Sequence, residues 1–168
     1  MIIGLISFLG LVFGYYLTKR FKQELKDVEK FTVIGISIVI ILLIINLVLI
    51  SNLSLIFVIG IIFGILTSLI IKNIYFYFGF VLVLSSIINL DARFNVAILI
   101  FIYGLLFSNV NFKKINVKFI LTNLILFLLP FILLLLKEFT LQTSQIILGF
   151  GIGGLINGVR FSFKKAKK

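Results

Sequence analysis

The chain has 168 residues, of which 62% are hydrophobic and 12% charged, and its formal net charge is +11. Soluble domains carry about 45–50% apolar and about 25% charged residues. This composition therefore excludes an ordinary soluble domain, because too few polar side chains are present to cover a surface in water. It predicts that lipid is the solvent for most of the molecule.

Seven apolar runs follow one another along the chain and predict an all-α, polytopic transmembrane helix bundle. A bilayer core of about 30 Å needs about 17–25 helical residues, and most of the runs reach that length. They do not alternate apolar and polar residues, as the strands of a membrane barrel would. The predicted spans, within a single membrane domain of residues 1–168, are about 1–18, 31–50, 54–71, 74–90, 94–108, 118–136 and 144–163. The fifth run is short and the seventh is rich in glycine, so whether these two cross fully stays open.

The basic residues predict the orientation of the bundle. If all seven runs cross, 14 of the 16 basic residues fall on one side. They are Lys19, Arg20, Lys22, Lys26, Lys30, Lys72, Lys113, Lys114, Lys118, Arg160, Lys164, Lys165, Lys167 and Lys168. Only Arg93 and Lys137 fall on the other side. Because basic residues favour the cytoplasmic side of a membrane, we expect the N-terminus outside and the C-terminus in the cytoplasm, in the plasma membrane of the cell.

The first apolar run is expected to remain as a helix. A signal peptide carries positive charge before its apolar stretch and a small-residue cleavage site after it, whereas here a basic segment follows the run. This segment, residues 19–30, places Phe21, Leu25 and Val28 on one helical face. It predicts an amphipathic cytoplasmic helix that lies on the inner leaflet or extends the first span. A docking surface for an acidic partner is the alternative.

Residue types that serve catalysis are scarce in this chain. It has no His and no Cys, which removes imidazole zinc sites, histidine bases, thiolates and disulfides. Its five acidic residues do not place two carboxylates in one span, so a membrane aspartyl site has no pair to use. Residues 149–154 match G-x-G-x-x-G, but the preceding strand that a dinucleotide site needs is not expected there. No enzyme, cofactor or metal site is predicted.

Glycines spaced by four residues occur in the first, third and seventh runs. Such spacing makes a groove on one helix face, which lets two backbones approach closely in lipid. The pairs are Gly10 and Gly14, Gly60 and Gly64, Gly149 and Gly153, and Gly154 and Gly158. They predict helix packing, either within one chain or between copies. Gly79 lies outside any such spacing and is expected to tolerate a larger side chain better.

Polar side chains within the spans gather at two depths. Asn46, Ser86 and Asn89 lie toward the outer side, and Asn123 and Asn157 lie toward the inner side. Residues of this kind make interhelical hydrogen bonds or line a solute pathway. No internal repeat is evident along the chain.

These features predict a non-catalytic integral membrane protein, a packing or assembly subunit of a larger membrane complex. The alternative is a small permease or channel, acting alone or as an oligomer, and a lipid-modifying enzyme ranks third. The expected partners are the bilayer, anionic lipid headgroups at the cytoplasmic face, and other membrane subunits or copies of the chain. Topology accounts for the basic charge, so no nucleic-acid partner is expected.

Overall fold

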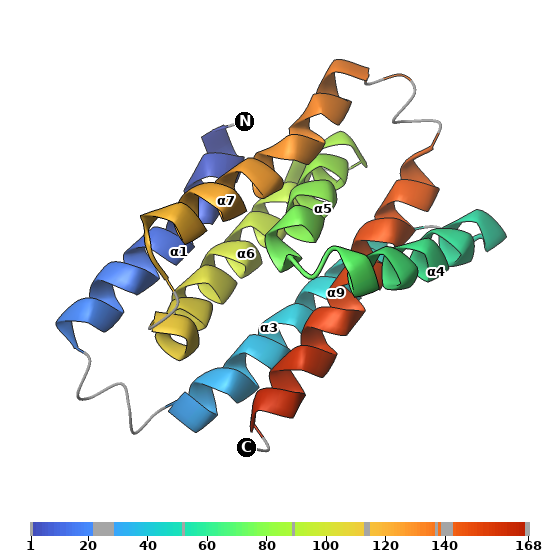
Figure 1. Cartoon of the computed structure of the whole chain (residues 1–168). Helices are drawn as coiled ribbons and strands as arrows, with labels where there is room; N and C mark the ends of the chain where they lie inside the picture. Colours follow the sequence, from blue (N-terminus) through green and yellow to red (C-terminus); the bar gives the residue numbers. More distant parts are fainter. Residues whose placement is uncertain are drawn as a thin grey trace.

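The computed structural model describes residues 2–21, 29–51, 53–88, 90–112, 115–136, 138 and 143–166, without the side chains of residues 29, 30, 90 and 159–166. All regular structure in this part of the chain is helical, which confirms the predicted all-α class. The helices are α1 (Ile2–Arg20), α3 (Glu29–Ile50), α4 (Leu55–Ile70), α5 (Ile74–Ile88), α6 (Leu90–Asn111), α7 (Val117–Leu128), the 3₁₀ helix η2 (Leu129–Leu136) and α9 (Ser144–Ala166). Because η2 continues α7, they form seven rods (Figure 1).

Four of the rods are long and apolar enough to cross a membrane, namely α1, α3, α6 and α7 with η2. The fold is therefore that of an integral membrane protein by length and composition. The fifth apolar run is not the short one, since α6 has 22 residues and begins at Leu90. Asp91 lies in its first turn, where a negative charge favours the helix N-terminus. The short helices are α4, with 16 residues, and α5, with 15.

The rods alternate in direction, and the two termini lie at opposite ends of the bundle (Figure 1). One end gathers the C-terminal ends of α1, α6 and α9 and the N-terminal ends of α3 and α7. We call it the basic end, because Lys19, Arg20 and Lys118 lie there. Asp91 and Glu138 lie at the opposite end. The segment 22–28, on which most of the predicted amphipathic helix falls, lies outside the described residues.

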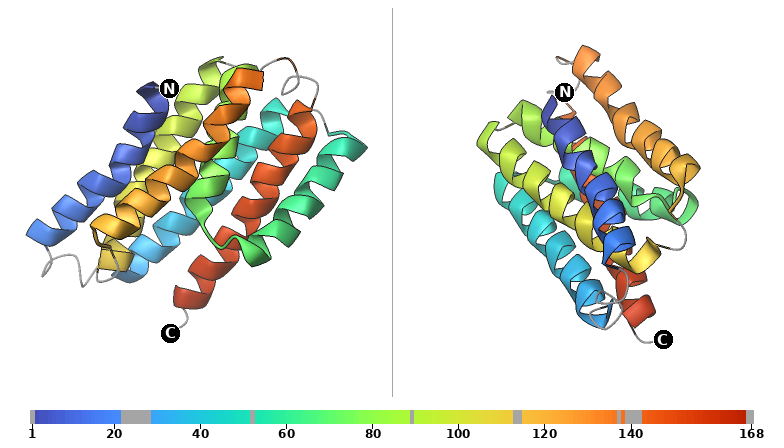
Figure 2. Two further views of the ribbon diagram at one scale, coloured as in Figure 1. Left: turned by 45° about the horizontal axis from the view of Figure 1, so that its top comes forward. Right: turned by 90° about the vertical axis from the view of Figure 1, so that its left-hand side faces the viewer.

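Helices α1 and α6 lie side by side with almost nothing between their backbones (Figure 2, left). A Cβ atom built at Gly10 would lie 2.8 Å from the Cα of Phe101. One built at Gly14 would lie 2.8 Å from the Cα of Leu105. On α6, Gly104 lies equally close to the α1 backbone at Gly10 and Leu11. Real Cβ atoms do not approach so closely, so only glycine permits this spacing.

Helices α4 and α9 make a second pair of the same kind. Gly60 and Gly64 face the backbones of Ile146 and Phe150, and Gly149 faces the backbone of α4. Adding 50 to the residue numbers of the two α1 glycines, 10 and 14, gives the two α4 glycines, 60 and 64. Adding 45 to the numbers of their α6 contacts, 101 and 105, gives the α9 contacts, 146 and 150. In both pairs the residue numbers rise together, so both are parallel. The two pairs are thus packed in an equivalent way that the sequence alone does not reveal.

Helices α3 and α5 lie between the two pairs, and α7 packs against α5. Helix α7 changes to the tighter η2 around Pro130, which cannot donate a backbone hydrogen bond. Gly79 of α5 packs against this point, and a Cβ there would lie 3.0 Å from the ring of Pro130. The expectation that Gly79 tolerates a larger side chain is therefore wrong, because a close helix contact needs no spacing of four.

The connection between α4 and α5, residues 71–73, does not reach the basic end. The residues that flank it contact α9 well before the end of that helix: Ser68 contacts Asn157, and Ile74 contacts Gly158. Helix α9 then continues to Ala166. At about 1.5 Å per residue, the connection stops about 12 Å short of the end of α9. Figure 1 shows this connection beside the middle of α9. We call residues 71–73 the recessed link.

Candidate functional site

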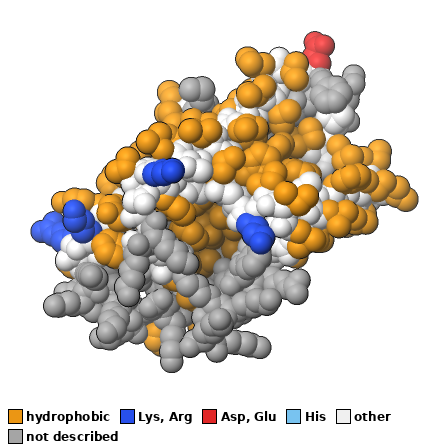
Figure 3. All heavy atoms as spheres, viewed as in Figure 1, with side chains coloured by type: hydrophobic (Ala, Val, Ile, Leu, Met, Phe, Trp, Pro, Cys, Tyr) orange, Lys and Arg blue, Asp and Glu red, His pale blue; other side chains and the backbone are white. Residues whose placement is uncertain are grey.

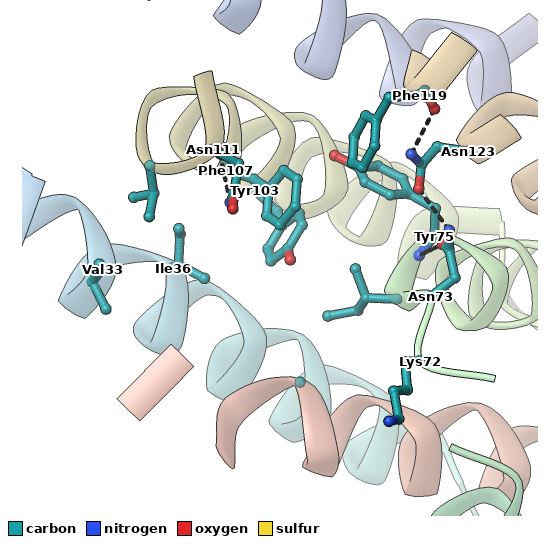
Figure 4. Close-up of a pocket in the computed structure, with 13 residues that line it drawn as sticks. Val33, Ile36, Lys72, Asn73, Tyr75, Tyr103, Phe107, Asn111, Phe119 and Asn123 are labelled. Carbon is teal, nitrogen blue, oxygen red and sulfur yellow. Dashed lines mark hydrogen bonds between the residues drawn. The ribbon is translucent and has the colours of Figure 1, made fainter. Parts of the chain in front are cut away.

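A cavity of about 280 Å³ lies between the recessed link and the basic end of the bundle. It is walled by α3, α5, α6, α7 and α9, and the short α4–α5 hairpin makes room for it. The lining residues are Val33, Ile36, Lys72, Asn73, Ile74, Tyr75, Tyr103, Phe107, Val110, Asn111, Phe119, Asn123 and Gly158. Figure 4 shows these side chains converging from separate helices.

The cavity is partly open to the surface, and it is closed toward the opposite end of the bundle. Tyr75 and Tyr103, which form its floor, are 1% and 3% exposed. Below them lie Phe78 and Leu82, both buried in the core. Lys72 is exposed at the rim. Figure 3 shows a hollow with hydrophobic walls between basic side chains.

One wall of the cavity is a row of aromatic rings, which we call the aromatic row: Tyr103, Phe107 and Phe119. Tyr103 and Phe107 stack with ring centroids 5.5 Å apart. Phe107 and Phe119 lie nearly parallel, with an interplanar angle of 10° and centroids 6.4 Å apart. Phe78 supports the row edge-on against Tyr103 at 4.7 Å. A flat apolar group has a continuous surface to lie on from the floor to the mouth.

Two amide side chains attach the recessed link to α7. Asn73 Nδ2 donates to Asn123 Oδ1 at 2.8 Å, and Asn123 Nδ2 donates to the carbonyl of Phe119 at 2.7 Å (Figure 4). Asn73 Oδ1 accepts from the backbone N–H of Tyr75 at 3.0 Å and so caps the start of α5. The two asparagines fix the position of the link while keeping polar groups on the cavity surface.

The link is also held from α5 and α9. The Tyr77 hydroxyl donates to the carbonyl of Ile71 at 3.3 Å, which satisfies a backbone group that the end of α4 leaves free. Asn157 Nδ2 donates to Ser68 Oγ and to the carbonyl of Ile65. Three helices therefore determine where the α4–α5 hairpin turns, and the recess is a specified feature of the fold.

The floor of the cavity contains a hydroxyl group with hydrogen-bonding capacity left over. The Tyr75 hydroxyl is buried and has no hydrogen-bond partner among the described residues. The oxygen is closed off from the cavity by its neighbours, and leaving such a buried polar group unsatisfied costs the fold about 1–3 kcal/mol. The lining as a whole offers one ammonium, three amides and two phenols, which suits binding and offers no paired acid and base.

The residues predicted for a polar pathway are not brought together in one place. Asn123 lines the cavity, and Asn157 lines a smaller space of about 20 Å³ that also borders Lys72 and Gly158. Ser86, in the other half of the bundle, donates to the carbonyl of Leu82 in its own helix at 2.7 Å. Asn46 lies in that half too, and its buried Oδ1 has no partner within the described part of the chain. Asn89 lies outside the described residues.

The eight glycines predicted for helix packing all lie at helix–helix contacts within the chain. Six of them belong to the two parallel pairs: Gly10, Gly14, Gly60, Gly64, Gly149 and Gly153. The other two face α5, where Gly154 lies against the ring of Tyr77 and Gly158 against the side chain of Ile74.

Lys72 is a candidate site residue that the sequence does not single out. Its sequence position marks it only as one of the basic residues that indicate orientation, whereas the structure sets it in the recessed link at the cavity rim. A signal for this was present. Helices α4 and α5 make the two shortest rods among the described residues, since η2 continues the 12 residues of α7, and only three residues separate them. A hairpin shorter than the bilayer core is expected to turn within it, together with any charge in its turn.

No protein-family model, curated protein or solved structure matches the chain.

Proposed function

We propose that this chain is a small membrane permease that binds a solute in the cavity above the recessed link. The observation that carries the proposal is the cavity itself: it lies in the half of the bundle toward the basic end, is closed by tyrosines at its floor, and is lined by polar groups that an apolar packing core would not need. The basic end faces the cytoplasm in this proposal, so the cavity is the site of the carrier on its cytoplasmic side.

The two equivalent helix pairs support a carrier mechanism. Many secondary transporters consist of two similar halves, and some of these are parallel repeats related by an axis along the membrane normal. The substrate lies between the halves, and rocking of one half against the other exposes it to each side in turn. Here the α1–α6 pair contributes one wall through Tyr103 and Phe107, and the α4–α9 pair contributes Gly158 and leads into the recessed link.

The backbone contacts within each pair favour motion of pairs as units. Without side chains between them, the two helices of a pair cannot slide without collision between backbone atoms. Between the pairs, α3 and α5 pack through side chains, which can change rotamer. Movement is therefore cheapest at the boundary where the cavity lies.

The alternative, a packing or assembly subunit, is favoured by the absence of catalytic residues, the minimal loops and the glycine faces. Those faces pack against helices of the same chain, so the glycine spacing needs no partner subunit to explain it. A permease needs no catalytic group, in keeping with the expectation that the protein is not an enzyme. The bilayer is its proposed solvent, and anionic headgroups are its proposed contact at the basic end.

Cysteine labelling tests the proposal without knowledge of the substrate, because the chain contains no cysteine. Ile36 lines the cavity and is 4% exposed. In membrane vesicles of both orientations, Ile36→Cys should react with a membrane-impermeant thiol reagent from either side, since a carrier exposes its site to both. Labelling from the basic side alone would mean a static pocket and would overturn the permease proposal.

Leu43→Cys is the matched control. Leu43 lies two turns further along the same helix, is fully buried and does not line the cavity. It should stay unreactive in folded protein, so its labelling would reveal general unfolding of the variant.

A further inference from the structure

We propose that the solute is a small organic anion, with a carboxylate that pairs with Lys72 and an apolar body that lies on the aromatic row. This inference rests on the permease proposal and adds the chemical class of the substrate. It follows from the charge at the rim, the donors around it and the shape of the interior.

Among the described residues that line the cavity, Lys72 is the one with a charged side chain. The two acidic side chains that the structure describes, Asp91 and Glu138, lie at the opposite end of the bundle. A charged side chain at membrane depth is costly unless it borders a wet cavity or meets a counter-ion, and such residues mark substrate pathways. A solute that brings a carboxylate to Lys72 supplies the counter-charge that the described lining lacks.

Helix α5 adds to the attraction for an anion. Its N-terminus begins at Ile74, directly after the recessed link, and both residues flanking this point line the cavity. The N-terminal end of a helix carries a partial positive charge, and its dipole acts over the first turn. Asn73 and Asn123 place amide groups beside it. Asn73 Nδ2 has a second hydrogen beyond the one donated to Asn123, and Asn123 Nδ2 has a second beyond the one donated to the carbonyl of Phe119. The rim is thus rich in donors and carries positive charge.

The interior fits a compact apolar body. The aromatic row forms one side, and Ile36 and Val33 of α3 face it across the cavity (Figure 4). At about 30 Å³ for each water in the liquid, about 280 Å³ has room for about nine waters. A single-ring or short branched carboxylate fills that space.

Binding of three matched probes tests the inference: benzoate, its neutral amide benzamide, and the cation benzylamine. The chain contains no tryptophan, so a tryptophan in place of Phe119, on the cavity wall, gives a single fluorescent reporter in purified full-length protein. We expect benzoate to bind about tenfold more tightly than benzamide, as befits a hydrogen bond to a charged group, and benzylamine to bind most weakly.

Substitutions in the same reporter protein test whether Lys72 causes the preference for benzoate over benzamide. Lys72→Gln should abolish the advantage of benzoate over benzamide, and Lys72→Arg should keep it. Lys118→Gln is the control for net charge, since Lys118 is exposed at the same end and does not line the cavity. It should leave the preference unchanged.

Two results would overturn the anion proposal: equal binding of benzoate and benzamide, or an unchanged preference after Lys72→Gln. Either would leave the cavity as a solute site of another chemical class if Ile36→Cys still labels from both sides. Absence of binding by all three probes also rejects the anion proposal. Only one-sided labelling of Ile36→Cys rejects the permease itself, so the two failures are distinguishable.

Discussion

Gly64 illustrates how a single missing side chain sets the distance between two helices. A Cβ built there would lie 3.0 Å from the Cα of Gly153 and closer still to the carbonyl of Phe150. Gly64→Ala should therefore push α4 away from α9 and lower the free energy of unfolding by about 1–3 kcal/mol, the usual cost of overpacking. Unfolding of the purified protein by titration with a denaturing detergent would measure the loss.

Gly35 provides the matched control for that change. A Cβ at Gly35 would meet only the end of the Leu106 side chain, at 3.3 Å, which can move aside. Alanine is also a better helix former than glycine by about 0.5–1 kcal/mol. Gly35→Ala should thus be neutral or stabilising, and equal damage from both substitutions would contradict the packing account.

For single residues, the sequence predicts the spacing of the packing glycines better than it predicts which helices they contact. A repeat of four identifies a groove on a helix because it depends only on helical geometry. It does not say which helix fills the groove, and it misses Gly79, whose contact with Pro130 comes from another helix. The depth of Lys72 was missed for a similar reason, since depth depends on where a hairpin turns within the bundle.

Among the elements, the α4–α5 hairpin depends most clearly on polar side chains. Asn73 and Asn123 bond to each other across 50 positions in the sequence. Alanine at both positions in a double-mutant cycle should show a coupling free energy of about 0.6 kcal/mol and at most about 1.7, the range for hydrogen bonds inside membrane proteins. The measurement is the free energy of unfolding of the two single variants and the double variant.

Thr122 serves as the control in this cycle. Its hydroxyl bonds to the carbonyl of Lys118 in its own helix, and its side chain is exposed. Thr122→Ala should be additive with Asn73→Ala. Coupling of similar size in both cycles would mean that the link is not held by the Asn73–Asn123 bond.

Helix positions followed well from hydropathy, and helix lengths followed less well. The apolar run at 94–108 suggested a short fifth helix, but α6 begins earlier at Leu90 because polar residues are acceptable where a helix emerges from lipid. The change from α7 to η2 at Leu129 was foreseeable from Pro130. The recess of residues 71–73 was not, since it results from bonds to Tyr77, Asn123 and Asn157.

For the whole molecule, the distribution of basic residues predicts which end faces the cytoplasm. In intact cells, Ser51→Cys and Gln142→Cys should react with an impermeant thiol reagent. Gln23→Cys should react only after the membrane is made permeable, because it lies in the basic segment after α1. The reverse pattern would place the cavity mouth on the outside of the cell and contradict the predicted orientation.

Whole-molecule packing is also where the sequence is least informative. Alternating directions follow from seven runs in series, but the pairing of α1 with α6 and of α4 with α9 joins segments distant in the sequence. Nothing in a local pattern selects these partners over others. Ser108 Oγ of α6, for example, donates to the carbonyl of Leu11 at 2.8 Å, a contact that only the assembled pair creates.

The two parallel pairs also bear on how the protein is made. Gly10 contacts Phe101, and Gly60 contacts Ile146. The helix that covers each glycine face is therefore synthesised about 90 residues after the face itself. At synthesis rates of about 5–20 residues per second, that delay is roughly 5–20 s. During this interval α1 and α4 are both in the bilayer with their faces uncovered when α6 arrives, and both faces have the same register. Correct assembly therefore requires that the nascent α6 pair with α1, and α4 remains without its partner until α9 leaves the ribosome.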